Sequence, residues 1–398
     1  MADKTLKILF LSPEVVPFAK SGGLADVAGS LPLALKSLGM EVRIVLPYYR
    51  VIKDGDYQIK LFLKDFEVPL GEENLKSDVF KTFLEEEIPV YLLDREDLYD
   101  RPNLYGNVSG DYYDNLERFT LFCHGALRLT QQLDFRPDII HCHDWQTGIV
   151  PALLKGPYKS NPRLSGASTV FTIHNIGYQG TFPTDKLPIT GLSRADFLHL
   201  DGVEYWGKIS LLKAGIVYSD AITTVSPTYS KEIQTSEYGM GMEGILESRR
   251  DTLYGILNGV DYKKWDPETD TYIDTQYSAK RLSGKQKCKK ALIREMNLDP
   301  SLEKRPLLGI LSRLDAQKGL DIIIKVLDQL LAKDIGLIIL GTGNSEIEAA
   351  IKKKVSQHRS RLGTHFGFNE ALAHKILAGS DIFLMPSRER VSLMFCQP

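Results

Sequence analysis

The chain has 398 residues, a length that allows two or three domains, each with its own core. Hydrophobic residues make up 43% and charged residues 25%, a composition that excludes an intrinsically disordered chain. The 49 basic and 51 acidic side chains give a net charge of −2, which argues against non-specific binding of nucleic acid. A local site for an anion is still compatible with this balance.

The N-terminus and the cysteines favour a cytoplasmic protein. The apolar run Ile8 to Leu11 before Ser12 and Pro13 is too short for the apolar region of a signal peptide. No later stretch is long and apolar enough to span a bilayer, so no membrane partner is expected. The cysteines form no Cys-x-x-Cys pair, as is usual in a reducing compartment; they are Cys123, Cys142, Cys288 and Cys396.

The apolar pattern in the first part of the chain predicts parallel strands that alternate with helices. The apolar run from Leu6 to Leu11 predicts a buried strand. Apolar residues three and four apart then predict a helix from Leu24 to Leu38, with Pro32 as a kink. Further strands are predicted at Val42 to Leu46, Asp138 to Cys142, Thr169 to Ile173 and Ala221 to Val225.

A second α/β unit follows a turn-rich segment. The segment from Gly255 to Lys290 predicts a crossover between domains. Since ligands of parallel sheets bind outside the carboxyl ends of the strands, two facing sheets imply a cleft between the domains. The second unit is predicted to contain helices at Leu320 to Leu331 and Asn344 to Lys354, and strands at Leu307 to Leu311, Gly336 to Leu340, His365 to Phe368 and Asp381 to Met385.

A glycine pair starts the first predicted helix. Gly22 and Gly23 expose backbone N–H groups that can meet an anion, and Lys20 adds a positive charge. The alternative is a plain glycine-rich turn with a solvated lysine. The segment is neither a Walker A loop nor a Gly-x-Gly-x-x-Gly fingerprint, which disfavours a nicotinamide-dependent oxidoreductase.

Titratable residues end two of the predicted strands. His141 and His143 share one face of a strand, Asp144 follows at its exit, and His174 ends the next strand. The histidine pair lacks a third metal ligand at a recognisable spacing, so we expect packing or hydrogen bonding rather than a metal site. Asp144 is the better functional candidate, with a helix N-cap as its alternative, and the position of His174 also favours function.

Two cations stand near the start of a helix in the second unit. Arg313 and Lys318 bracket the loop after the first strand of this unit, next to the positive end of a helix dipole. Without an anionic partner both charges would be unfavourable there, so phosphate or pyrophosphate recognition explains them better than a solvated loop. Gly341 and Gly343 offer a further backbone approach to a nucleotide.

In this order, the segments resemble the bacterial glycogen synthases and plant starch synthases, which are retaining glycosyltransferases of the GT-B architecture. The resemblance implies an α/β fold of two Rossmann-like domains, at residues 1–258 and 259–398, with an inter-domain cleft. It rests on KSGGLADV (20–27), HCHDWQTG (141–148), FTIHNIGYQG (171–180), KAGIVYSDAITTVSPTYSKEI (213–233), YGMGMEGIL (238–246), ILNGVD (256–261) and SRLDAQKGLD (312–321).

The resemblance implies transfer of glucose from ADP-glucose to the non-reducing end of an α-1,4-glucan. Configuration at the anomeric carbon would be retained, with the donor itself as the base and with no metal or other cofactor. The sequence offers no paired carboxylates of a hydrolase at a readable spacing. UDP-glucose as the donor and a non-catalytic glucan- or nucleotide-binding fragment are the alternatives.

Residue roles follow from the matching motifs. Lys20, Arg313 and Lys318 would hold the pyrophosphate of the donor and stabilise the charge that grows on departing ADP. Asp144 and His174 would orient the transferred glucose near its cationic centre. The resemblance assigns Tyr105 and Asn258 to the glucose and acceptor side, and gives Gly22 and Gly23 a close backbone approach to the donor.

The family pattern fails after Arg388. The family continues with a Phe-Glu-Pro-Cys-Gly-Leu motif, further βα units and a last helix, whereas this chain reads differently from Glu389 to Pro398. The active-site glutamate of the family is missing, and Glu389 stands one place early, so we give it no role. We hypothesise a frameshifted or prematurely terminated product, whose incomplete second domain lacks strands and exposes an apolar sheet edge.

Overall fold

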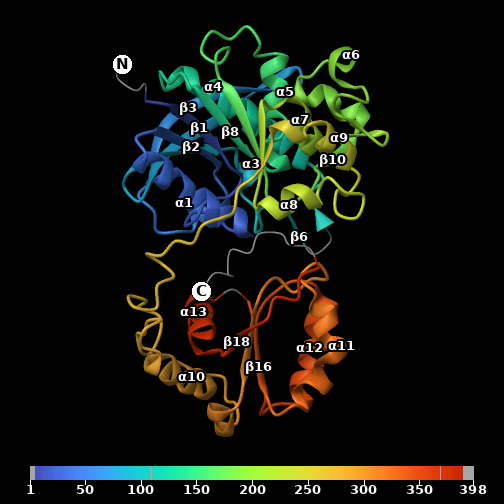
Figure 1. Ribbon diagram of the computed structural model, residues 1–398. Helices are drawn as coiled ribbons and strands as arrows, with labels where there is room; N and C mark the ends of the chain where they lie inside the picture. Colours follow the sequence, from blue (N-terminus) through green and yellow to red (C-terminus); the bar gives the residue numbers. More distant parts are fainter. Residues whose placement is uncertain (1–4, 108–109, 368, 389–398) are drawn as a thin grey trace. The chain divides into compact units, whose positions relative to one another are not determined.

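The computed structural model describes residues 5–107, 110–367 and 369–388 and contains two compact units. The chain passes from the first unit to the second between Asn258 and Gly259. Each unit is an α/β structure built on its own sheet (Figure 1). None of the helices in the described ranges combines the length and the apolar character that a membrane crossing requires.

The first unit is built on a nine-stranded sheet whose order is β14-β13-β9-β8-β1-β2-β5-β4-β3. The strands from β14 to β5 run parallel, and β3 and β4 form an antiparallel hairpin at one edge. Their bounds are β1 (Lys7–Leu11), β2 (Glu41–Pro47), β3 (Lys60–Leu70), β4 (Glu73–Leu84), β5 (Ile88–Asp94), β8 (Ile139–His143), β9 (Ser168–Ile173), β13 (Ala221–Thr224) and β14 (Leu253–Gly255).

The strand order of this sheet reverses between β1 and β8. From β1 the chain adds β2 and β5 on one side, and then β8, β9, β13 and β14 on the other. Open parallel sheets bind ligands at the carboxyl ends of the strands where the order reverses, a position known as the switch point. The loops that leave β1 and β8 are therefore where a ligand site is expected.

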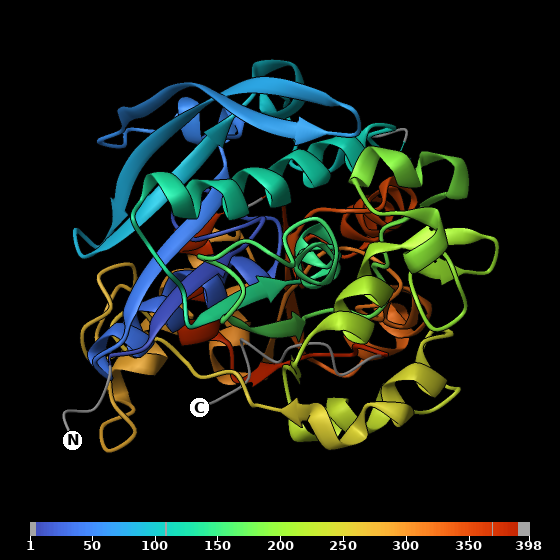
Figure 2. The same cartoon turned by 90° about the horizontal axis from the view of Figure 1, so that it is seen from above.

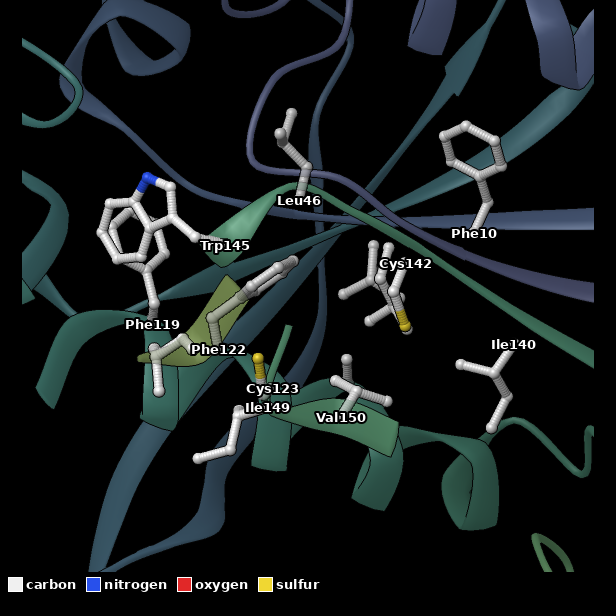
Figure 3. Packing of buried hydrophobic residues seen from close by; sticks show 14 of the residues in the cluster. Phe10, Leu46, Phe119, Phe122, Cys123, Ile140, Cys142, Trp145, Ile149 and Val150 are labelled. Atoms are coloured by element: carbon white, nitrogen blue, oxygen red, sulfur yellow. The ribbon is translucent and has the colours of Figure 1, made fainter. Parts of the chain in front are cut away.

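Buried side chains fix the two strands at this switch point. Phe119, Phe122 and Cys123 of α4 (Asn115–Gln132) pack with Trp145, which directly follows Asp144 at the exit of β8 (Figure 3). Helix α4, teal in Figure 2, packs on β3 of the edge hairpin. The other helices of the unit are α1 (Gly23–Ser37), α2 (Arg50–Lys53), α3 (Glu96–Tyr99), α5 (Val150–Lys155), α6 (Arg194–Phe197), α7 (Leu211–Tyr218), α8 (Pro227–Glu232) and α9 (Glu243–Ser248).

Short elements complete the first unit. The strands β10 (Thr181–Pro183), β12 (Lys208–Ser210) and β11 (Glu204–Tyr205) form a three-stranded antiparallel sheet in that order. The strands β6 (Gly106–Asn107) and β7 (Gly110–Asp111) pair with each other. The 3₁₀ helices are η1 (Trp145–Thr147), η2 (Thr184–Thr190) and η3 (Arg250–Thr252).

The second unit has a parallel four-stranded sheet in the order β17-β16-β15-β18. Its strand order reverses between β15 and β18, which gives this unit a switch point of its own. The bounds are β15 (Leu307–Leu311), β16 (Gly336–Gly341), β17 (Leu362–Phe366), β18 (Ile382–Phe383), α10 (Ser283–Glu295), η4 (Pro300–Lys304), α11 (Leu320–Leu331), α12 (Ser345–Gln357) and α13 (Glu370–Gly379).

Helices cover both faces of the second sheet (Figure 1). Leu337 and Ile339 of β16 pack with the apolar residues of α11 and α12, whereas Ile338 and Leu340 pack with those of α10 and α13. This alternation follows from the two-residue period of a strand. A strand that is buried on both faces reads as a continuous apolar run, which explains why the sequence predicts β15 and β16 so closely.

The structure corrects three sequence predictions and adds elements that the sequence does not predict, among them the β3–β4 hairpin and β5. Helix α10 begins at Ser283, inside the segment that we predicted to be an irregular crossover, because its polar residues hide a narrow apolar face. The strand expected from His365 lies at β17 instead, and only two residues of the run from Asp381 pair as β18. The β3–β4 hairpin is absent from the prediction because much of β3 is exposed and lacks an apolar run. Phe368 lies outside the described residues.

Candidate functional site

Asp144 occupies the first position after β8, at the switch point of the first sheet. It is 8% exposed, with φ of +55° and ψ of −178°. This backbone region is open almost only to glycine, and strain of this kind gathers at functional sites. Its side chain does not cap η1, as the N-cap alternative requires; Oδ1 instead accepts the backbone N–H of His174 at 2.7 Å.

The Asp144 carboxyl group is held near the point where it changes charge. Burial raises its pKa to about 7, against the lowering effect of backbone N–H groups of His174 and Asn175, and the Glu14 carboxylate adds to the rise. A carboxyl group with a pKa near neutrality can respond to a charge that develops beside it. Asp144 is therefore the most distinctive titratable group at this end of the sheet.

Three histidines stand near Asp144, of which His143 and His174 are buried and His141 is half-buried. The ring centroids of His141 and His143 lie 4.2 Å apart, and Nδ1 of His143 lies 3.0 Å from Nε2 of His174. Nε2 of His141 lies 2.7 Å from the hydroxyl of Thr172, so the expected packing and hydrogen bonding of His141 and His143 are confirmed. No group of three or more His, Cys, Asp or Glu side chains within the described ranges is arranged to hold a metal ion.

These histidines are neutral near pH 7. Burial lowers the pKa of His141 to about 4 and that of His174 to about 3, and it also holds the pKa of His143 well below its usual range. Within the described part of the chain, Nδ1 of His174 and Nε2 of His143 are buried without a hydrogen-bond partner. Buried polar atoms are nearly always paired, so an unpaired one invites a ligand group.

Glu14 is a site residue that the sequence analysis missed. It is 4% exposed in the loop between β1 and α1. One carboxylate oxygen accepts the hydroxyls of Ser21 at 2.5 Å and Tyr105 at 2.7 Å, and the other accepts the N–H groups of Ser21 at 2.5 Å and Gly22 at 3.1 Å. Its signal in the sequence is a charge that stands three residues after a buried strand.

Glu14 joins the glycine loop to Tyr105 and places both near Asp144. The pKa of the Tyr105 hydroxyl is held well above its usual range by burial and by the charges of Glu14 and Asp144. The N–H of Gly22, which we expected to meet a donor anion, is directed at Glu14. Gly22 itself has open space where a side chain would stand, and Gly23 is the first residue of α1.

Two other predicted residues lie near this end of the sheet. Nζ of Lys20 forms an ion pair with Oδ1 of Asp26 at 2.7 Å, so this cation already has an acidic neighbour. Asn258 is half-buried and follows β14 by three residues, on the side where the parallel strands end.

In the second unit, Arg313 and Lys318 lie in the loop after β15, at the switch point. The Arg313 guanidinium is 3.7 Å from Asp315 Oδ2 and 3.5 Å from Gln317 Oε1, and its side chain is 43% exposed. The backbone N–H of Lys318 donates to Asp315 Oδ1 at 2.8 Å, so Asp315 shapes this loop. Arg388, which follows β18, donates to Asp321 at 2.6 Å and is a further cation that the analysis missed.

Packing between loops accounts for the two predicted glycines of this unit. A Cβ atom on Gly341, where φ is +158°, would lie 1.9 Å from the carbonyl oxygen of Ser312. Only glycine therefore lets the loops after β15 and β16 pack together here. The N–H of Gly343 donates to Glu348 Oε1 at 3.1 Å, so this amide is already engaged by a side chain. Glu389 lies outside the described residues.

Sequence comparisons find relatives along nearly the whole chain. The family description "Starch synthase catalytic domain" matches residues 7–248, and "Glycosyl transferases group 1" matches residues 305–396. A glycogen synthase of Geotalea daltonii is 44% identical over 383 residues, and glycogen synthase 2 of Geobacter sulfurreducens is 42% identical over 383 residues. Each alignment covers 96% of this chain and 78% of the relative.

A solved structure has the same fold. The catalytic domain of starch synthase IV from Arabidopsis thaliana, bound to ADP and acarbose, matches with a TM-score of 0.90 and 32% identity. The match covers 97% of this chain and 79% of that one. The prediction of a GT-B α/β fold is thereby confirmed.

Proposed function

The chain belongs to the family of bacterial glycogen synthases and plant starch synthases, and on this premise we propose that it transfers glucose from ADP-glucose to the non-reducing end of an α-1,4-glucan, with retention. The observation that carries the proposal is Asp144, a strained and buried carboxyl group at the switch point, bonded to the backbone of His174. The ADP bound to starch synthase IV supports an adenine nucleotide as the donor.

Asp144 and His174 serve the transferred glucose in this proposal. Positive charge develops at the anomeric carbon as its bond to phosphate breaks, and a nearby buried carboxylate stabilises that charge. The unpartnered Nδ1 of neutral His174 can exchange a hydrogen bond with a sugar hydroxyl. Glu14 already accepts four hydrogen bonds, so its role is to position the glycine loop and Tyr105.

Lys20, Arg313 and Lys318 hold the diphosphate of the donor in this proposal. The side chain of Arg313 is 43% exposed, and its guanidinium can form charge-assisted bonds to phosphate. A phosphate oxygen must compete with Asp26 for Lys20. Cations in these positions stabilise the negative charge that grows on departing ADP more than they stabilise bound donor.

The transfer step needs no nucleophile from the protein. The bond between the anomeric carbon and the phosphate oxygen breaks as the bond to the acceptor hydroxyl oxygen forms on the same face. The departing phosphate oxygen takes the proton of that hydroxyl, so the donor itself is the base.

Incorporation of radiolabelled glucose from ADP-glucose into glycogen by the purified chain tests the proposal. We expect incorporation that excess UDP-glucose reduces little. Asp144→Asn and His174→Ala should each lower kcat at least about a hundredfold, the scale found when one preorganised group is removed from a charged transition state. Asp251→Asn is the control, because that side chain is 95% exposed.

Two outcomes would contradict the proposal. ADP or glycogen binding without any turnover would identify a non-catalytic fragment. Full activity of Asp144→Asn would remove the observation on which the proposed site depends.

A further inference from the structure

Three loops of the first unit carry exposed apolar side chains. Trp206, in the turn between β11 and β12, is 82% exposed, and Tyr178, in the loop after β9, is 49% exposed. Met240, between α8 and α9, is 47% exposed. We call these three residues, together with Tyr205, the aromatic platform. Single exposed apolar side chains are common on protein surfaces, whereas a group of them on joined loops marks a surface that binds a ligand.

Hydrogen bonds and packing join the three loops that carry the platform. The Tyr205 hydroxyl donates to the Met240 carbonyl oxygen at 2.9 Å, and Nε2 of Gln179 donates to the same oxygen at 2.8 Å. The rings of Tyr205 and Trp206 pack edge to face, with centroids 6.4 Å apart. Cε of Met240 lies 3.9 Å from the position that a Cβ on Gly177 would take. The loop after β9 is thus tied to the other two loops.

Backbone conformation indicates that fold stability alone does not explain Trp206. Its φ is +50°, and that of Gly207 is +76°, so the pair forms a two-residue hairpin turn with both φ angles positive. Such turns favour asparagine before glycine, whereas a bulky side chain is disfavoured in the left-handed region. Met240 has the same feature, with φ of +52° before Gly241 at +84°. Both strained positions present apolar side chains to solvent.

We propose that the aromatic platform is a subsite for the glucan acceptor, in which the rings of Trp206 and Tyr178 pack against sugar rings. This inference rests on the proposed function, which supplies the glucan. The C–H faces of pyranose rings pack on aromatic faces, while sugar hydroxyls can bond to an indole N–H or a tyrosine hydroxyl. An amphipathic surface of tyrosine, tryptophan and methionine therefore fits an uncharged polysaccharide.

The platform lies a short chain distance from the candidate catalytic residues. The loop that begins at His174 reaches Tyr178 four residues later, so their Cα atoms are at most about 14 Å apart. A glucan whose end lies at His174 needs only a short run of sugar units to reach the platform. The subsite then selects long acceptors over short ones, because a second contact on the same chain adds to the first.

Two variants of Trp206 test the subsite against a matched control. Trp206→Ala removes the ring, and Trp206→Asn removes it while supplying the residue that the turn prefers, so the second variant should unfold at a temperature no lower than the wild type. Phe83→Ala is the control, because Phe83 is a 47% exposed aromatic residue. It lies on β4, near the β3 edge of the nine-stranded sheet, whereas the platform loop follows β9.

The measurements are co-sedimentation with glycogen in the absence of donor and acceptor kinetics at saturating ADP-glucose. Both Trp206 variants should weaken glycogen binding and raise KM for maltoheptaose about tenfold, with kcat and KM for maltotriose little changed. Phe83→Ala should behave as the wild type. If the wild type transfers glucose and both variants keep its glycogen binding and its KM for maltoheptaose, the subsite is overturned and the proposed function stands.

The same measurements also distinguish a failure of the proposed function from a failure of the subsite. If the wild type transfers no glucose, the proposed function fails. Loss of glycogen co-sedimentation in Trp206→Asn would then still support the platform as a glucan site, and unchanged co-sedimentation would overturn it.

Discussion

At the scale of single residues, Asp144 combines a strained backbone with a buried charge. Its own N–H donates to the carbonyl of Thr172 at 2.9 Å, and its carboxylate accepts the N–H of His174 at 2.7 Å. Both bonds tie the residue to the end of β9, the strand that pairs with β8. The strain, of about 1–3 kcal/mol, is therefore tolerated because the surrounding sheet determines the conformation.

Glycine at position 144 should be more stable than alanine, although both lack the carboxylate. Glycine relieves strain of about 1–3 kcal/mol and costs about 0.5–1 kcal/mol of chain entropy. The unfolding free energy of Asp144→Gly should therefore exceed that of Asp144→Ala by about 1 kcal/mol. Urea unfolding of the two variants measures the difference. The control is the exposed Asp251, which has no positive φ. There the alanine variant should be more stable than the glycine variant. Equal stability of the two variants at position 144 would show that the residue is not strained.

The role of Glu14 illustrates what single-residue patterns cannot predict. Asp144 and His174 could be found because each ends an apolar strand, where parallel sheets present functional groups. Glu14 also follows such a strand, yet its function depends on a loop that folds back to bring Ser21 and Tyr105 to its carboxylate. Contacts between residues 91 positions apart leave no local spacing to read.

At the scale of elements, His124 joins helix α4 to two segments that pack beside it. Its Nδ1 lies 2.9 Å from the hydroxyl of Tyr158, and its Nε2 lies 3.0 Å from the carbonyl oxygen of Thr190, at the end of η2. Burial lowers the pKa of His124 to about 4, and the bond to Thr190 opposes this shift. The folded protein therefore favours the neutral form of this ring.

Low pH should destabilise the packing of α4 with these two segments. A histidine whose pKa is about 6.5 in the unfolded chain and about 4 in the folded one contributes stability that is complete above pH 6.5 and is lost as the pH falls toward 4. Between pH 7 and pH 5, the wild type should lose about 2 kcal/mol more unfolding free energy than His124→Gln. Urea titrations at the two pH values measure this, with the exposed His199→Gln as the control. Identical losses in wild type and His124→Gln would contradict it.

Burial helps to decide which elements the sequence reveals, although the buried strand β5 is not predicted. β1, β8, β9 and β15 are largely buried, so their apolar runs predict them to within a residue or two. The antiparallel hairpin alternates between exposed and buried positions, and its register shifts interrupt even that alternation. The glycines at 341 and 343 are visible in the sequence, but their packing against the loop after β15 depends on tertiary structure.

At the scale of the whole molecule, the two units repeat one arrangement. In each sheet, the strand order reverses beside the strand that comes first along the chain. This strand is β1 in one unit and β15 in the other. In each, the loop after that strand carries a cation that leads into a helix, Lys20 before α1 and Arg313 before α11. The proposed function assigns both cations to one diphosphate, so their contributions to donor binding should depend on each other.

This interdependence can be measured as a coupling free energy. If Lys20 and Arg313 bind the same diphosphate, the effects of Lys20→Ala and Arg313→Ala on ADP affinity should not add. Each single variant should weaken ADP binding about tenfold or more, and the double variant should differ from the sum of the two by about 0.5–3 kcal/mol. Isothermal titration calorimetry of the wild type, both single variants and the double variant gives this term directly.

A control cycle removes the contribution of general electrostatics. Lys64 is exposed on β3, at the edge of the first sheet farthest from β14, so Lys64→Ala changes net charge without touching the switch point. Its effect should be small and should add to that of Arg313→Ala. Additive effects of Lys20→Ala and Arg313→Ala, as in the control cycle, would show that the two cations act on separate ligands or surfaces. The proposal that Lys20 and Arg313 hold one diphosphate would then fail, and stabilisation of the charge on departing ADP would need another explanation.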